Sequence, residues 1–478
     1  MTPRRNGFLP MSSRPPISAL PSRTWRLLAA PALAVLLLGG CAGIGTRTST
    51  QPTVVGSPQM VEASELARSG TVLTGQARID NERRIHQLLA QLDDDSLARE
   101  AASLPPGDPL YNYMGQALLE RGLPLPRPFD HTAWTFDANN RPPAESDGYR
   151  PPVKLAILLP LSGQMAVAAS PVRDGFMAGY YGERRRRPEV NFYDTAGTTA
   201  GTLSAYDRAV TEGNDFVVGP LERNAVDALF ARNSMPVSLL ALNSGTQAPP
   251  PGNASFALAP EDEGIAAAEY LLARSVQRVL VVSGSDDSQR RAVDAFRTRL
   301  TERGATVTDV VGEGVADLGP FAAREGGVDA VFLAVRGSSA RELTPKLALA
   351  GLGGVPRVAT SQITSGTGDP EKDRALDGIA FPTEAWTSGS ITGLPSASYA
   401  ATLLPTARGA AARLFAFGYD AWLLSAYMER LVKNVDGSIQ GATGTLRVDG
   451  FGNVQRTPAW ASFISGVVMP LPGGGDRR

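Results

Sequence analysis

From residue 153 onward, short apolar runs rich in β-branched residues alternate with amphipathic segments of helical length. This alternation is typical of βαβ units, in which apolar strands are buried in a parallel sheet that helices cover. The sequence therefore predicts an α/β fold for this part of the chain. We predict strands at 153–159, 189–193, 216–219, 237–242, 278–283, 306–311, 330–334, 357–360 and 378–381. We predict helices at 165–181, 199–212, 225–233, 263–274, 289–303 and 341–350.

Small polar residues follow the ends of these predicted strands. Ligands of open α/β sheets lie beyond the carboxyl ends of the strands, so we expect these loops to converge on one cleft. Each loop is also an ordinary strand-to-helix turn, so residue type alone assigns no single residue to a ligand. The candidate cleft residues are Ser162, Gly163, Asp194, Thr195, Gly219, Pro220, Asn243, Ser244, Ser283, Gly284, Arg336, Ser338 and Thr360.

The N-terminal region contains one long apolar stretch, residues 27–38, which basic residues precede and the only cysteine of the chain, Cys41, closely follows. This order is typical of a secretory signal peptide, and the stretch is shorter than the ~20 residues that a membrane-spanning helix needs. The small residues before Cys41 resemble the lipobox of bacterial lipoproteins. That resemblance implies cleavage before Cys41 and lipidation of its sulfur, and either Met1 or Met11 serves as a start.

Composition divides the rest of the chain. Residues 41–75 are rich in Ser, Thr, Gly and Pro and predict a flexible tether. Apolar residues at helical spacing predict one short helical hairpin within residues 76–122, and the proline-rich residues 123–152 predict a linker. The α/β part then covers residues 153–470. Ala42, rather than aspartate, follows Cys41, which by resemblance to lipoprotein sorting implies the outer membrane, facing the periplasm.

Several function classes are disfavoured by composition. The chain has 46 basic and 47 acidic residues, so its net charge of −1 does not favour a nucleic-acid partner. Its two histidines both precede the α/β part, and it contains no G-x-S-x-G elbow, no paired histidine ligands and no phosphate-binding glycine motif. We therefore expect no catalytic residue, metal or cofactor. A glycan hydrolase that uses only carboxylates stays open, because that chemistry needs just two acids.

Three motifs resemble the type I periplasmic-binding-protein fold. They read VKLAILLPLSG (153–163), DGF (174–176) and VGPL (218–221). The resemblance implies two lobes with Rossmann-like parallel sheets, preceded here by a short helical region. It places residues 153–257 and 381–437 in lobe one and residues 258–380 and 438–468, with the hairpin around Asn453, in lobe two.

Four further motifs are similar to those of the LppC-type lipoproteins, a family that contains outer-membrane activators of bifunctional penicillin-binding proteins. They read YDT (193–195), AFGYDA (416–421), GATGTL (441–446) and DGFGNVQR (449–456). Activators in this family carry a long helical-repeat domain ahead of the binding-fold domain, whereas only about one helical hairpin fits before residue 153 here. No solute-binding residue is carried over, because an activator need not bind a small ligand.

The sequence also predicts where one late helix and one tryptophan lie. The apolar residues of 411–433 predict a late helix whose apolar face packs into the core. Trp386 lies in a polar, glycine-rich stretch, where we expect an exposed loop and a candidate partner contact.

The leading hypothesis is a lipid-anchored protein that binds and activates a peptidoglycan synthase, a class A penicillin-binding protein, without catalysis of its own. The alternative is a lipid-anchored periplasmic receptor for a small solute, such as an amino acid, an amide or a muropeptide.

Overall fold

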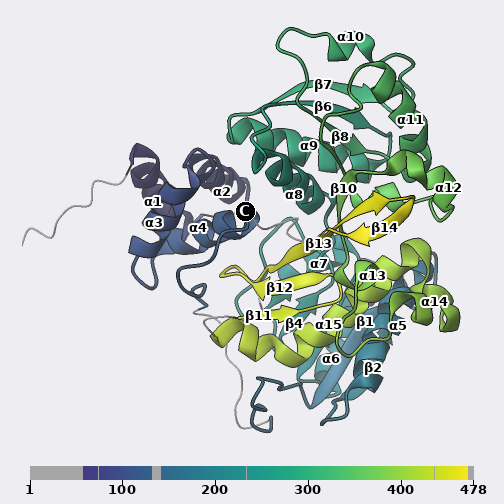
Figure 1. Cartoon of the computed structure of the whole chain (residues 1–478). Helices are drawn as coiled ribbons and strands as arrows, with labels where there is room; N and C mark the ends of the chain where they lie inside the picture. The colour runs from purple at the N-terminus through teal and green to yellow at the C-terminus, as the bar shows by residue number, and fades with distance from the viewer. Residues whose placement is uncertain (1–56, 74, 132–140, 233, 435–436, 472–478) are drawn as a thin grey trace, which may run out of the picture. The chain divides into compact units, whose positions relative to one another are not determined.

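The computed structural model describes residues 57–73, 75–131, 141–232, 234–434 and 437–471, all within the unit Val55–Arg478 (Figure 1). The signal sequence and Cys41, predicted to be lipidated, lie outside the described residues. None of the helices in these ranges is both long and apolar enough to cross a bilayer.

The first described part is a group of four helices, drawn in purple and blue in Figure 1. They are α1 (Pro58–Gly70), α2 (Gly75–Ala90), α3 (Asp94–Ser103) and α4 (Pro109–Glu120). Their buried apolar faces form a core of their own, which includes Met60, Ile85, Leu97, Leu110 and Met114. This group therefore has its own hydrophobic core, ahead of the α/β part.

Two predictions for this part are wrong. Residues 58–70 form α1 rather than belonging to a flexible tether, because Ser57 caps the helix, Pro58 begins it, and the small Ala63 and Ala67 are buried. The expected helical hairpin is a four-helix group. Asp93 ends the first predicted helix early, since its side chain accepts a hydrogen bond from Ser96 N at 2.8 Å and starts α3.

Lobe one is built on a five-stranded parallel sheet in the order β2-β1-β3-β4-β5. Its strands are β1 (Lys154–Leu159), β2 (Glu189–Asp194), β3 (Phe216–Val218), β4 (Leu239–Ala241) and β5 (Ala254–Ser255). Its helices are α5 (Ala166–Gly182), α6 (Thr199–Thr211), α7 (Arg223–Phe230) and the late α15 (Gly409–Lys433). The late helix packs into the core as expected, with Phe417 and Trp422 buried against the sheet and α5.

Lobe two is built on a nine-stranded sheet in the order β11-β12-β13-β10-β9-β8-β6-β7, and β14 pairs with β13. Strands β7, β6, β8, β9 and β10 are parallel, and the later strands join antiparallel. The strands are β6 (Arg278–Ser283), β7 (Thr306–Gly312), β8 (Ala330–Ala334), β9 (Arg357–Ala359), β10 (Ile379–Thr383), β11 (Ser438–Gln440), β12 (Gly444–Val448), β13 (Val454–Ile464) and β14 (Val467–Pro470).

Helices and short turns cover this second sheet. The helices are α8 (Pro260–Leu272), α9 (Asp287–Glu302), α10 (Gly319–Ala322), α11 (Gly337–Leu349), α12 (Pro370–Asp373) and α13 (Ala385–Ser388), and the 3-10 turns are η1 (Ser361–Thr364) and η2 (Arg374–Leu376). Helix α14 (Ala397–Leu403) and the 3-10 turn η3 (Pro405–Ala407) pack instead against α15 and α5 of lobe one. The predicted fold class, parallel α/β with a preceding helical region, is confirmed.

The chain crosses between the lobes three times. It passes from β5 to α8, returns after β10 to reach α15, and passes again from α15 to β11. The hairpin of β12 and β13, which the sequence assigned to lobe two, pairs in the lobe-two sheet. Its two ends differ: Val454 is buried in the lobe-one core, whereas Phe463 is buried in the lobe-two core. Strand β13 therefore belongs to both cores.

Candidate functional site

The loops that follow β1 and β2 are joined by the carboxylate of Asp194. Its Oδ1 accepts hydrogen bonds from Leu161 N at 2.9 Å and from Ala196 N at 2.8 Å. Hydrogen bonds from the Ser162 side chain and from Ala196 N–H keep the pKa of Asp194 below its usual value, although burial opposes them. Gly163 lies in the loop after β1, and Thr195, directly after β2, is buried. Asp194 is thus an ionised group that fixes the shape of two loops.

The loops after β3 and β4 are also tied together. The Asn243 side chain donates to Leu221 O at 2.7 Å, and its oxygen accepts from Ser244 N at 2.9 Å. Gly219-Pro220 turns the chain away from β3 with a Gly219 φ of 105°, and a Cβ at Gly219 would lie 2.1 Å from Leu158 O. Only glycine fits this position.

The candidate residues of lobe two form a second group. Ser283 is the last residue of β6 and Gly284 follows it, and Ser338 lies in the first turn of α11. The Arg336 guanidinium forms an exposed ion pair with Asp286 at 2.7 Å. The hydroxyl of Thr360 is buried and has no hydrogen-bond partner in the described structure. The structure places the candidate residues in two groups, one on each lobe, and their contact with a ligand stays a prediction.

The ion pairs that join the two lobes centre on Arg413, which sequence reasoning missed. Arg413 lies in α15 of lobe one, 2.5 Å from Glu263 of α8 and 3.1 Å from Glu384, which follows β10. Ser361 N and Oγ both donate to the Glu263 carboxylate, at 2.8 and 2.9 Å. Burial raises the pKa of Glu263, but Arg413 and the other donors outweigh it, so the net pKa is lowered. A carboxylate that is only 4% exposed is therefore ionised against Arg413.

Two of the sequence motifs meet at Asp420. This fully buried carboxylate in α15 accepts hydrogen bonds from Ala442 N and from the N–H and hydroxyl of Thr443, the first residues before β12. Burial raises the pKa of Asp420 to about 7. The motifs at 416–421 and 441–446 therefore act as one structural unit.

A third motif, at 449–456, connects to the helical group. Asp449 accepts hydrogen bonds from Phe451 N at 2.9 Å and Asn453 N at 2.8 Å, which closes the turn between β12 and β13. Gln116 of α4 also donates to Asp449, and the ring of Phe451 lies 4.6 Å from the ring of Tyr113. The tip of this hairpin is thus a docking point for the helical group.

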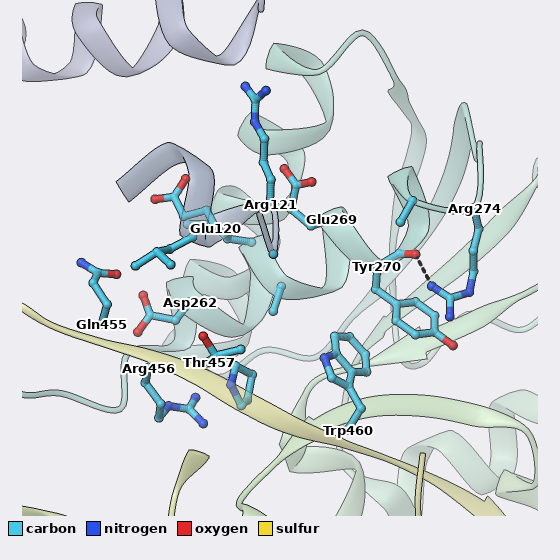
Figure 2. A pocket seen from close by; sticks show the side chains of 16 residues that line it. Glu120, Arg121, Asp262, Glu269, Tyr270, Arg274, Gln455, Arg456, Thr457 and Trp460 are labelled. Carbon is cyan, nitrogen blue, oxygen red and sulfur yellow. Dashed lines mark hydrogen bonds between the residues drawn. The ribbon is translucent and has the colours of Figure 1, made fainter. Parts of the chain in front are cut away.

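Arginines complete the junction between the helical group and lobe two. Arg299 forms ion pairs with Glu269 at 2.6 Å and with Glu120 of α4 at 3.1 Å, and Arg303 pairs with Asp94 of α3 at 3.1 Å. Beside them lies a cavity of about 150 Å³ between α4, α8 and β13 (Figure 2). No sequence pattern indicated this cavity, because its walls come from three distant segments.

Trp386 is not on an exposed loop, and that expectation is wrong. Its side chain is fully buried, its indole N–H donates to Pro395 O at 2.8 Å, and its ring stacks on Phe415 of α15 at 5.0 Å. A buried ring offers no surface to a partner, so Trp386 is a core residue. Within the described ranges, no group of histidine, cysteine and acidic side chains could hold a metal ion.

Comparisons with known proteins agree with this architecture. The model of the family described as "LppC putative lipoprotein" matches residues 149–312 and 305–466. The "Penicillin-binding protein activator LpoA" of Photobacterium profundum is 28% identical over 357 residues, which cover 66% of this chain and 56% of that protein. The chain thus spans about half the length of the curated relatives it matches.

Solved structures show the same fold. The structure "LpoA (YraM) C-domain from Haemophilus influenzae, a regulator of PBP1A" is 23% identical, with a TM-score of 0.58, over 66% of this chain and 99% of that one. A putative branched-chain amino acid ABC transporter from Chromobacterium violaceum is 26% identical, with a TM-score of 0.52, over 65% of this chain and 100% of that one. The α/β part therefore shares its fold with a protein described as a regulator of PBP1A and with a protein described as a putative ABC transporter.

Proposed function

Because this chain belongs to the LppC family of lipoproteins, we propose that it binds a peptidoglycan synthase and stimulates it. The observation that carries the proposal is that the chain is 28% identical in sequence, across both lobes, to a protein named as a penicillin-binding protein activator. The partner would be a bifunctional, class A penicillin-binding protein.

The name of this relative, an activator, supports a role as a binding module without catalysis of its own. Arg413 forms ion pairs with two carboxylates across the lobes, and these pairs hold the two lobes of the binding module together. The activator would raise synthase activity by binding the active conformer of the synthase more tightly than the inactive one, because only a difference in affinity shifts a conformational equilibrium.

We place the protein at the outer membrane, facing the periplasm, with Cys41 as the lipidated residue. The sequence around Cys41 and the family's description as lipoproteins support this placement. Two acyl chains provide stable anchoring where a single chain gives only marginal binding.

The experiment is proximity cross-linking in intact cells, followed by a glycan-synthesis assay with the purified partner. We expect a class A penicillin-binding protein among the captured proteins and faster glycan synthesis when this protein is added. The Cys41→Ser variant is the matched control. It should no longer be found in the membrane fraction, but it should still stimulate the purified synthase. Capture of no cell-wall synthase, together with an unchanged synthesis rate, would refute the proposal.

A receptor for a small solute is the second candidate, and the likeness to the C. violaceum transport protein favours it. A solute at 100 times its dissociation constant should stabilise the protein by about 2.7 kcal/mol. Thermal unfolding in the presence of amino acids, amides and muropeptides tests this function, and an unchanged melting temperature with all of them would exclude it for those solutes.

A further inference from the structure

The cavity between α4, α8 and β13 lies away from the candidate cleft and has a mixed lining. One wall is aromatic: Trp460 stacks on Tyr270 with ring centres 4.4 Å apart, and Arg274 covers Tyr270 at 3.4 Å. Leu119 and Ile265 add aliphatic surface. A cavity of about 150 Å³ is large enough to hold a benzene-sized molecule.

The second feature of the cavity is the carboxylate of Asp262, in the first turn of α8. Asp262 lines the cavity and is itself exposed to solvent, and Figure 2 shows its side chain between Glu120, Gln455 and the strand β13. Among the described residues, no hydrogen bond or ion pair reaches the Asp262 side chain. Desolvation by the surrounding protein atoms raises the pKa of Asp262 to about 6, and the positive charge of Arg456 partly opposes this shift, so Asp262 is mostly ionised at neutral pH.

The basic residues that line the same cavity are directed elsewhere. Figure 2 shows the Arg456 side chain on the other side of β13 from Asp262, where it donates to Thr443 O at 3.3 Å. Arg121 donates to the carbonyl oxygens of Leu92 and Leu89, both at 2.8 Å. The cavity therefore offers a carboxylate that accepts no hydrogen bond from the protein and feels the charge of Arg456 only at longer range, beside aliphatic and aromatic surface.

We propose that this cavity binds an aliphatic primary ammonium group, with the ammonium on Asp262 and its short carbon chain against Ile265 and Trp460. A carboxylate without a donor is matched by a group that supplies up to three N–H donors and a positive charge. Trp460 and Leu119 match the carbon chain, since apolar walls favour an apolar stem. The ammonium can belong to a free amine or to the side chain of a peptide. The inference does not depend on the proposed function, and its test contains no synthase.

The test is isothermal titration calorimetry at pH 7.5 with two probes. n-Butylamine represents a free amine, and Nα-acetyl-lysine amide represents a peptide-borne amine. We expect saturable one-to-one binding of at least one probe, and which of the two binds identifies the source. 1-Butanol, which has the same size without the charge, should bind at least about tenfold more weakly, because its hydroxyl supplies a single donor and no positive charge to the carboxylate. Affinity should also fall as the pH drops through about 6, where Asp262 gains a proton.

Three variants isolate the site. Asp262→Asn should weaken binding at least about tenfold without loss of stability, because it removes an exposed charge that accepts no hydrogen bond from the protein. Ala266→Leu should abolish binding by filling the cavity. Asp294→Asn, which removes the same charge from an exposed position on α9, should bind as the wild type does. Equal affinities for the wild type and Asp262→Asn, or no saturable binding of either amine up to about 10 mM, would overturn the inference.

Discussion

Arg413 offers the sharpest test of how the two lobes are held together. In Arg413→Met, the apolar stem of the side chain is kept, but Glu263 and Glu384, which are 4% and 5% exposed, lose their positive partner. Removing one partner of a buried pair costs about 3–5 kcal/mol. Because the Arg413 side chain is itself 25% exposed, we expect a loss of about 3 kcal/mol in the free energy of unfolding at pH 7.5.

The pH dependence of this loss distinguishes an ion pair from simple packing. In the wild type, the lowered pKa of Glu263 contributes stability above its ordinary titration range, and this contribution disappears as the pH falls through the lowered value. Without Arg413, burial dominates and raises the pKa of Glu263, so the variant becomes relatively more stable as the pH falls. The difference between the variant and the wild type should therefore be largest at pH 7.5 and shrink towards pH 4.5.

Urea unfolding followed by tryptophan fluorescence measures these differences. A loss of about 3 kcal/mol corresponds to a midpoint shift of about 1 M for a slope of about 3 kcal/mol per M. The double variant Arg413→Met/Glu263→Gln should recover part of the loss, because it no longer buries an unpaired charge. Arg290→Met is the matched control, since its ion pair with Asp287 is exposed and contributes less than about 1 kcal/mol. A loss below about 1 kcal/mol in Arg413→Met, or a loss that does not change with pH, would refute the ion-pair account.

Two further predictions concern positions where the backbone decides the outcome. Gly175→Ala in α5 should lower the free energy of unfolding by about 3 kcal/mol or more, because the new Cβ would lie 1.8 Å from Phe415 O of α15. The control Gly314→Ala has no atom within 4 Å of its new Cβ and should change the melting temperature little. Equal effects of the two variants would contradict this account. Asp420→Asn should lower the free energy of unfolding, measured with urea, by about 2–3 kcal/mol, because the new amide group turns an N–H towards the backbone N–H groups of Ala442 and Thr443. An unchanged free energy of unfolding would mean that these hydrogen bonds contribute little.

The strands of both sheets could be predicted because each one is marked by the apolar residues of its own short segment of sequence. Strands β6 and β8 have the predicted bounds, since each is a continuous apolar run that ends in small residues. The first helix was missed because Ala63 and Ala67, which form much of its buried face, give almost no contrast with their neighbours. Ser57 before Pro58 was the signal that could have identified it.

The site residues were less predictable because their partners are far apart in the sequence. Arg413 reads as an isolated charge near the start of an apolar helix, and nothing near it indicates Glu263 or Glu384. Trp386 lies among polar residues, so its burial depends on α15, whose Phe415 stacks on it. The resemblance located the motifs at 416–421 and 441–446, but only the folded structure shows that Asp420 joins them.

The late segments of the chain determine when the protein can finish folding. Helix α15 covers α5 in lobe one, and β13 contributes to both hydrophobic cores, yet both come after nearly all other segments in the order of synthesis. Neither lobe can be completed while the C-terminal region is still missing, so a chain that is cut short before residue 409 lacks parts of both. The two lobes can therefore be completed only together, after these last segments have been made, rather than one after the other.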